Sequence, residues 1–278
     1  MSKKAVGFLQ GGLGNQLFIY FSLVSVAQDN DLEPSFNKDS YGYDKFSRAL
    51  GLELLGFDIK FESSYFFKNR YLRLIFMKFG RYLLSNRIFN NYHFEYRSNQ
   101  HADFVINDDK DNYFFGYFQN EKYLNDEVVF DSYEGSEYVN SVRDKVQRKY
   151  SSEDTIAIHL RSYNEVKDEV CSIDKDYINA ALLELNYNKN KDRILVFTDS
   201  IEFSSSVLSG LNYDYFDEGF LFTAEETLIS ISSFERIICS NSSFAWWGAY
   251  FSKSEKVVYP KDRGYKYYPS PCKNWHLV

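Results

Sequence analysis

The sequence predicts an α/β protein built on parallel sheets, and two observations indicate this class. The chain opens with an apolar strand at 5–10, a glycine-rich turn at 11–16 and a helical segment at 17–27, which together form the first half of a βαβ unit. From residue 155 onward, short apolar runs alternate with helical segments, as in a Rossmann-like half. The 278 residues, 44% of them hydrophobic, suffice for two α/β domains or one large domain.

The second half of the chain has the clearer pattern of elements. Strands are expected at 155–160, 193–198, 213–216, 235–240 and 256–259, and helices at 174–187, 201–209, 224–232 and 244–252. A polar break at 151–154 follows a basic helix at 139–150, so we place a domain boundary there and expect domains at 1–150 and 151–278. Helices and aromatic-rich loops are expected to dominate the first domain, and Trp275 in the proline-containing tail is expected to pack back onto the second.

Composition narrows the function classes. The net charge is −7 and no Lys/Arg cluster stands out, which disfavours nucleic-acid binding. The three cysteines show neither metal-ligand spacing nor a disulfide framework, and no signal peptide or membrane-spanning run is visible, so we expect a cytoplasmic protein. The segment 66–84 mixes Lys/Arg with large apolar residues at near-helical spacing. It is either an ordinary amphipathic helix or a peripheral contact with the inner face of the membrane.

The stretch 239–250 is the most informative motif. An apolar strand leads into Ser-Asn-Ser-Ser and then into an apolar helix that contains Trp246 and Trp247. The N-terminus of a helix carries unsatisfied N–H groups and the positive end of its dipole, which suit a phosphate or a sugar hydroxyl. The alternative is a capped core helix with the two Trp side chains as filling.

The glycine turn at 11–16 has two alternative interpretations as well. Gly12 and Gly14 match the first two glycines of a dinucleotide-binding fingerprint, but Leu17 stands at the third position, which disfavours an NAD-dependent enzyme. The turn is then either a tight connection without a ligand or one in which glycine lets a ligand approach the backbone.

A strand at 155–160 leads into the third motif, which includes His159 and Arg161. Strand alternation predicts that these two side chains share one face. A guanidinium at the carboxyl end of a parallel strand can bind a diphosphate through two hydrogen bonds. The alternatives are a core histidine and a surface ion pair.

Together these motifs resemble the α-1,2-fucosyltransferase family, glycosyltransferase family 11. The resemblance rests on Gly-Gly-Leu-Gly-Asn-Gln-Leu-Phe at 11–18, His-Leu-Arg at 159–161 and Asn-Ser-Ser-Phe-Ala-Trp-Trp-Gly-Ala at 241–249. Weaker matches in the same order are Gly-Tyr-Phe-Gln-Asn-Glu-Lys-Tyr at 116–123, Val-Phe-Thr-Asp-Ser at 196–200 and Ala-Glu-Glu-Thr-Leu-Ile-Ser at 224–230.

The resemblance implies a GT-B fold, in which two Rossmann-like domains face each other across a cleft. Residues 1–150 then form an N-terminal acceptor-side domain and residues 151–278 a C-terminal donor nucleotide-binding domain. The implied reaction is transfer of L-fucose from GDP-β-L-fucose, with inversion and without a metal or other cofactor, to the 2-hydroxyl of a galactose-type acceptor. For a bacterial-type enzyme the acceptor belongs to a cell-surface polysaccharide or O-antigen unit and can be lipid-linked.

The resemblance also implies roles for individual residues. Arg161 neutralises the departing diphosphate and His159 positions the nucleotide. The other donor and sugar contacts are assigned to Gly12, Gly14, Asn15, Gln16, Asp199, Glu226, Asn241, Ser242, Ser243 and Phe244, with Glu226 accepting hydrogen bonds from guanine. Glu165 and Asp199 are the two candidates for the general base that deprotonates the acceptor hydroxyl.

One segment departs from the family pattern. The family usually has His-x-Arg-Arg-Gly-Asp-Tyr, whereas Ser162 replaces the second arginine here and Asn164 replaces the aspartate. A neutral amide cannot act as a base, and the loss of one guanidinium weakens charge complementarity to a diphosphate. The departures leave open a catalytically weak or inactive binding relative, or an enzyme with a different GDP-sugar donor.

Overall fold

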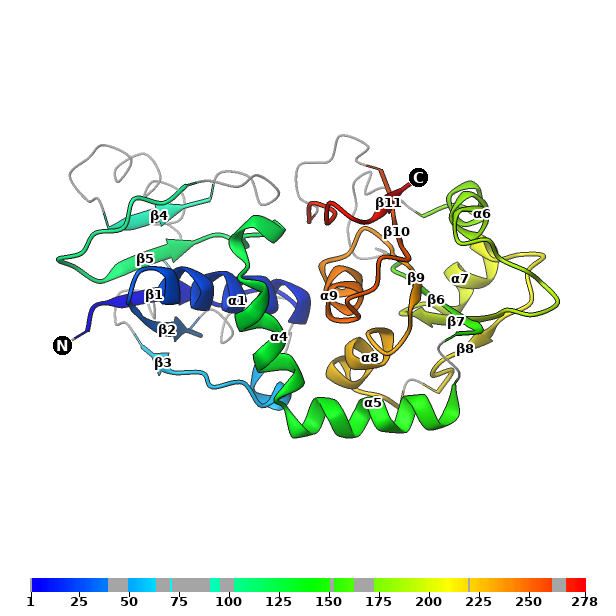
Figure 1. Ribbon diagram of the computed structural model, residues 1–278, viewed down its shortest axis with the longest axis horizontal. Helices are drawn as coiled ribbons and strands as arrows, with labels where there is room; N and C mark the ends of the chain where they lie inside the picture. Colours follow the sequence, from blue (N-terminus) through cyan, green and yellow to red (C-terminus); the bar gives the residue numbers. More distant parts are fainter. Residues whose placement is uncertain are drawn as a thin grey trace. The chain divides into compact units, whose positions relative to one another are not determined.

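In a computed structural model, residues 2–39, 50–63, 71, 91–95, 103–150, 153–162, 173–219, 221–261 and 269–278 are described. The chain divides into two compact units, Met1–Gly135 and Ser136–Val278. Each unit has its own parallel sheet, as the predicted α/β class requires (Figure 1).

The first unit contains a sheet in the order β3-β2-β1-β5-β4, with every pairing parallel. Its strands are β1 (Lys4–Phe8), β2 (Glu33–Asn37), β3 (Phe61–Glu62), β4 (Tyr92–Phe94) and β5 (Asn112–Phe115). Helix α1 (Leu13–Asp29) packs on this sheet, and a Cβ on Gly7 of β1 would lie only 3.0 Å from the Leu23 side chain. Two 3-10 turns (Leu52–Leu55, Glu121–Tyr123) and α4 (Asp126–Glu134) complete the described part.

The second unit contains a sheet in the order β11-β10-β9-β6-β7-β8, again with parallel pairings. The strands are β6 (Thr155–Leu160), β7 (Arg193–Thr198), β8 (Asp214–Tyr215), β9 (Arg236–Ile238), β10 (Val257–Tyr259) and β11 (His276–Leu277). The helices are α5 (Glu137–Lys149), α6 (Lys175–Glu184), α7 (Ile201–Val207), α8 (Ala224–Ile231) and α9 (Ser243–Phe251). This strand order is that of a doubly wound Rossmann sheet.

The helices of the second unit begin where side chains can satisfy their first N–H groups. Ser136, Asp174, Ser200 and Ser242 each accept a hydrogen bond from a backbone N–H in the first turn of α5, α6, α7 and α9. Helix α8 has a complete capping box between Thr223 and Glu226. The predicted helices and strands of this unit are thereby confirmed with small shifts at their ends.

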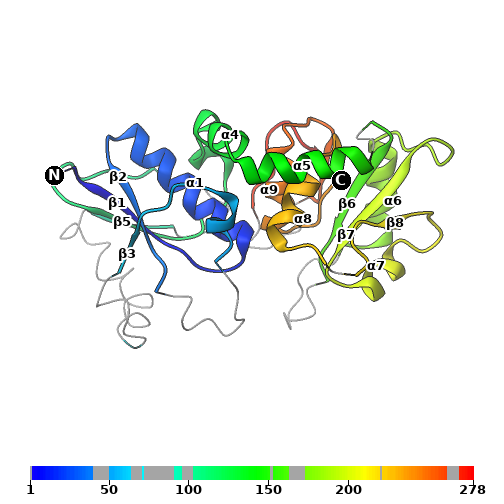
Figure 2. The same ribbon diagram turned by 90° about the horizontal axis from the view of Figure 1, so that it is seen from below.

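Two features of the chain differ from expectation. The boundary between the two units precedes α5, whereas we expected this helix in the first domain. The helix belongs to the second unit because its buried residues Val139, Val142 and Val146 form an apolar stripe and it packs on α8 (Figure 2). Strands β2 to β5 were not located because they are short and lack a long apolar run, as Glu-Pro-Ser-Phe-Asn in β2 illustrates.

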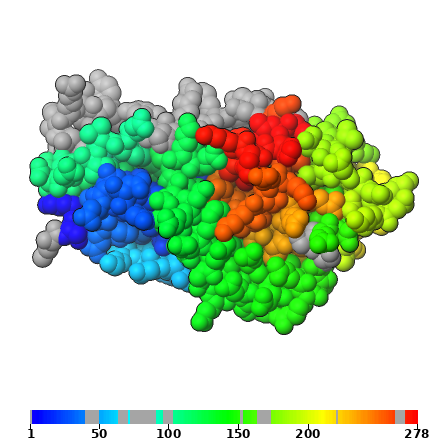
Figure 3. Space-filling view, viewed as in Figure 1, coloured from blue at the N-terminus to red at the C-terminus, as the bar shows by residue number. Residues whose placement is uncertain are grey.

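The C-terminal segment adds the edge strand β11 to the second sheet. Trp275 packs against Trp246 and Tyr259, with ring centroids 5.5 and 5.6 Å apart, which confirms that it folds back. The space-filling view shows this segment in red at the surface (Figure 3). No helix in the described ranges is both long and apolar enough to cross a bilayer.

Candidate functional site

The carboxyl ends of β6, β7 and β9 bring together predicted site residues from three parts of the chain. Strand β6 lies between β7 and β9. After β6 the chain forms β7 and β8 on one side of it, and then forms β9, β10 and β11 on the other side, so the strand order reverses at β6. A crevice outside the carboxyl ends of the strands at such a reversal is where open α/β sheets bind ligands. We therefore take this edge of the second sheet as the candidate donor site.

His159 lies at the centre of this edge. Because Ile158 pairs with Ile238, His159 lies beside the turn that follows β9, and its Nδ1 is 2.7 Å from the Ser240 Oγ. The pKa of His159 is lowered to about 4, mainly by burial; the charge of Asp199 opposes this shift, and the charge of Arg161 contributes to it. The imidazole is therefore neutral at pH 7 and can exchange a hydrogen bond without adding charge.

Arg161 and Asp199 follow the paired ends of β6 and β7. Leu160 pairs with Thr198, so the next residues are neighbours, and Arg161 Nη1 lies 2.8 Å from Asp199 Oδ2. The other carboxylate oxygen of Asp199 accepts a hydrogen bond from the Ser162 N–H at 2.9 Å. Both side chains stay about one-third exposed, at 37% and 30%, so the guanidinium is oriented but accessible.

The turn between β9 and α9 forms the third part of the edge. Ser242 caps α9 by accepting a hydrogen bond from the Phe244 N–H at 3.2 Å, and Asn241 is 4% exposed. Among the described residues, the N–H groups of Ser243 and Ala245 have no acceptor. The Phe244 ring lies 5.5 Å from the His159 ring, so the turn and the β6 end are in contact.

Trp246 and Trp247 have a packing role. Both are fully buried, and the Trp246 Nε1–H donates to the Ser270 carbonyl at 2.7 Å. Their rings pack against each other with centroids 5.1 Å apart. The interpretation of these two residues as core filling is confirmed, whereas the polar residues before them lie at the strand edge.

Glu226 closes the capping box of α8. Its Oε2 accepts from the Thr223 N–H at 2.9 Å, and its own N–H donates to the Thr223 Oγ1 at 3.2 Å. Among the described residues no partner is found for the second carboxylate oxygen, and the contact to guanine stays a prediction.

The glycine turn of the first unit lies at the carboxyl end of β1. Gly11, not Gly12 or Gly14, adopts a positive φ of 77°, and Gly12 is the N-cap of α1 with φ −76°. Gln16 is fully buried: its Nε2 donates to the Gly11 carbonyl and its Oε1 accepts from the Gly51 N–H, each at 3.0 Å. Both ends of its amide therefore hold backbone, and its expected role in lining the cleft stays a prediction.

Other predicted residues fall elsewhere or were missed. Glu165 and Asn164 lie outside the described residues, as do 66–70 and 72–84 of the basic segment. Ser240 was not assigned, although a hydroxyl two residues after a buried strand is a recognisable signal. Glu95, which is 5% exposed after β4, was also missed, because nothing in its local sequence distinguishes it from a surface carboxylate.

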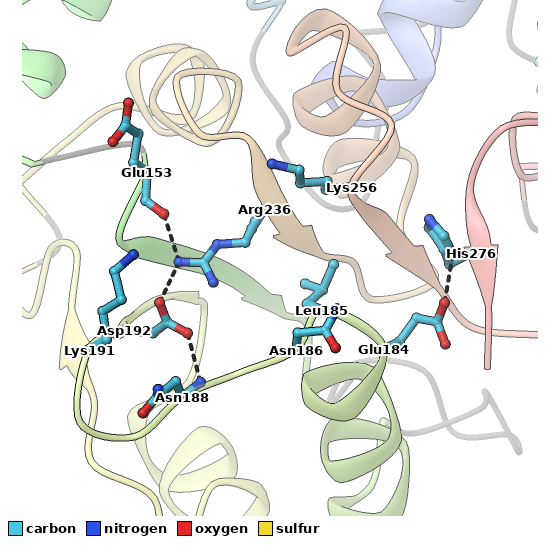
Figure 4. Close-up of a pocket in the computed structure, with 10 residues that line it drawn as sticks. All are labelled: Glu153, Glu184, Leu185, Asn186, Asn188, Lys191, Asp192, Arg236, Lys256 and His276. Carbon is cyan, nitrogen blue, oxygen red and sulfur yellow. Dashed lines mark hydrogen bonds and ion pairs between the residues drawn. The ribbon is translucent and has the colours of Figure 1, made fainter.

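A cavity of ≈560 Å³ lies at the opposite, amino-terminal edge of the second sheet (Figure 4). Arg236 projects into it, and its Nη2 donates to the Glu153 carbonyl and to Asp192 Oδ1, both at 2.8 Å. The hydrogen bond from Arg236 lowers the pKa of Asp192. His276 pairs with Glu184 at 2.7 Å, and none of the predicted site residues lines this cavity. We therefore infer that the charged side chains of this cavity form ion pairs that stabilise the amino-terminal edge of the second sheet.

The two parallel sheets place the chain in the GT-B-like α/β class, and the family match identifies it as a glycosyltransferase. The chain belongs to glycosyl transferase family 11, whose family model matches residues 63–262. No curated protein sequence matches the chain.

The chain is similar to several solved structures at low sequence identity. An Arg-to-Lys mutant of FUT1 from Arabidopsis thaliana in complex with GDP is 13% identical, with a TM-score of 0.51, and the match covers 89% of this chain and 68% of that one. Fucosyltransferase NodZ from Bradyrhizobium is 12% identical, with a TM-score of 0.47 and coverage of 89% and 93%. A family 9 glycosyl transferase from Veillonella parvula is 9% identical, with a TM-score of 0.45 and coverage of 99% and 85%.

Proposed function

We propose that this protein transfers L-fucose from GDP-β-L-fucose to the 2-hydroxyl of a galactose-type sugar, with inversion. Membership of family 11 and the fold shared with the GDP-bound FUT1 structure support a GDP-sugar donor. The observation that carries the proposal is the meeting of Arg161, His159 and the start of α9 at one reversal of strand order.

The charge distribution at this edge suits a diphosphate leaving group. Negative charge grows on the diphosphate as the bond to fucose breaks, and a guanidinium already oriented by Asp199 stabilises that charge without reorganising. The neutral His159 and the Ser243 and Ala245 N–H groups supply hydrogen bonds to the same anion. Asn241 and Ser242 form the rest of the turn.

Asp199 is better suited to positioning than to proton transfer. Each of its two oxygens already has a partner, since one contacts the Arg161 guanidinium and the other accepts from the Ser162 N–H. Of the two candidate bases we therefore keep Glu165 and assign Asp199 to the orientation of Arg161.

The test is release of GDP from GDP-fucose in the presence of methyl β-galactoside, followed by NMR assignment of the product linkage. We expect GDP release that depends on the galactoside, a fucosyl group on O2, and the same rate in EDTA. Parallel reactions with other GDP-sugars test the alternative that Ser162 marks an enzyme with a different donor. Turnover of another GDP-sugar in place of GDP-fucose contradicts the proposal. Binding of GDP without any turnover would identify a binding relative.

A further inference from the structure

Two amide side chains meet at the carboxyl edge of the first sheet. Asn15 lies in the first turn of α1, after β1, and Gln119 follows β5, the neighbour of β1. Although they are far apart in sequence, the Gln119 Nε2–H donates to the Asn15 Oδ1 at 2.8 Å. Their contact therefore bridges β1 and β5, the neighbouring strands at which the strand order of this sheet reverses.

The side-chain oxygen of Gln119 has no hydrogen-bond partner in the part of the chain that the structure describes. Gln119 is only 5% exposed, and its Oε1 is buried without a hydrogen bond to any described residue. Buried side-chain oxygens in native proteins are nearly always hydrogen-bonded, and an exception calls for a water or a ligand. Asn15 beside it is half-buried, so its side chain remains within reach of solvent.

The loop that carries Gln119 is held by a buried carboxylate. Glu95 Oε2 accepts from the N–H groups of Tyr117 and Phe118 at 2.7 and 2.8 Å. A Cβ on Gly116 would lie 2.5 Å from the Glu95 Cβ and 2.6 Å from its Oε2, so this approach requires glycine. Phe118 adopts a positive φ of 55°, which turns the chain just before Gln119. The amide is therefore positioned by specific contacts.

The chemistry of this pair favours a neutral ligand. A primary amide offers donors and an acceptor without charge, which complements sugar hydroxyls that both donate and accept. Neither amide supplies the cationic charge that a diphosphate attracts. From this geometry we infer that Gln119 and Asn15 bind hydroxyl groups of a sugar, with Glu95 as the positioning residue. The inference rests on the proposed function for the identity of that sugar, which is either the acceptor galactoside or the fucose of the donor.

The test compares Gln119→Ala and Asn15→Ala with Asn30→Ala. Asn30 lies at the other end of α1, where its exposed amide donates to the Val26 carbonyl at 2.8 Å, so it controls for loss of an amide from the same helix. We measure KM for methyl β-galactoside, KM for GDP-fucose and Kd for GDP. Circular dichroism establishes folding, and Asn15→Ala keeps the test decisive if Gln119→Ala fails to fold.

Loss of one hydrogen bond predicts about a tenfold rise in one sugar-dependent KM, with the Kd for GDP and the Asn30→Ala values unchanged. A rise in the galactoside KM assigns the hydroxyls to the acceptor, and a rise in the GDP-fucose KM assigns them to the donor. Unchanged KM values in both variants, or a weaker Kd for GDP, overturn the inference.

Saturation-transfer NMR of methyl β-galactoside and of free L-fucose separates this inference from the proposed function. If the wild-type protein releases no GDP, the proposed function fails. In that case the inference is still supported if Asn30→Ala binds the sugar while Gln119→Ala and Asn15→Ala do not. Equal sugar signals in all variants contradict it.

Discussion

Replacement of Arg161 by alanine separates catalysis from stability. The guanidinium lies 2.8 Å from Asp199, but the two side chains are 37% and 30% exposed, and a solvent-screened pair of this kind contributes about 0–1 kcal/mol to folding. Its proposed effect on the transition state is much larger. Removal of one preorganised group that stabilises developing negative charge typically costs about 2.7–4 kcal/mol, or about 10²–10³ in kcat. We therefore expect Arg161→Ala to lose activity and keep its stability.

The second unit offers a matched control. Arg193 Nε lies 2.8 Å from Asp214 Oδ2, a similar pair with exposures of 47% and 57%, but Arg193 begins β7 at the opposite edge of the sheet. Arg193→Ala should change stability as little as Arg161→Ala and leave kcat unchanged. Arg161→Lys keeps the positive charge but loses the planar fork, so its kcat should fall between those of wild type and Arg161→Ala.

The assay is the initial rate of GDP release at saturating GDP-fucose and galactoside, with urea unfolding of each variant in parallel. A kcat of Arg161→Ala close to the wild-type value would refute the proposed role of the guanidinium. Equal losses of kcat in Arg161→Ala and Arg193→Ala would show that the effect is general and would refute the reasoning in the same way.

Two further predictions concern the second unit. The pKa of His159 is about 4 in the folded protein, against an ordinary value near 6.5. Between these pH values the unfolded chain binds a proton on His159 that the folded protein does not bind. The free energy of unfolding therefore falls by on the order of 3 kcal/mol as the pH drops from 6.5 to 4. His159→Gln should flatten that part of the pH profile of urea unfolding, and an unchanged slope would contradict the assignment. Gly248→Ala places a Cβ 2.7 Å from the Ile231 Cγ2, so overpacking between α8 and α9 should cost about 1–3 kcal/mol. An unchanged urea midpoint would argue against such close contact between these helices.

The sequence alone determined the parallel α/β class and most elements of the second unit. Strands such as β6 and β7 have apolar centres, and serine or aspartate marks the start of several helices, so local signals suffice there. The motifs at 11–18, 159–161 and 241–249 predicted the family, which the match over 63–262 confirms. The short strands of the first unit lack such signals, because their stability comes from neighbouring strands.

Only the tertiary structure decided which neighbours each side chain meets. Alternation predicted that His159 and Arg161 share a face, but His159 contacts Ser240 beyond β9 and Arg161 contacts Asp199 beyond β7, on opposite sides of β6. The contact between Gln119 and Asn15 likewise depends on β1 and β5 being neighbours. Local sequence specifies where a strand ends, whereas the order of strands in the sheet, which is set by long-range packing, specifies which ends come together.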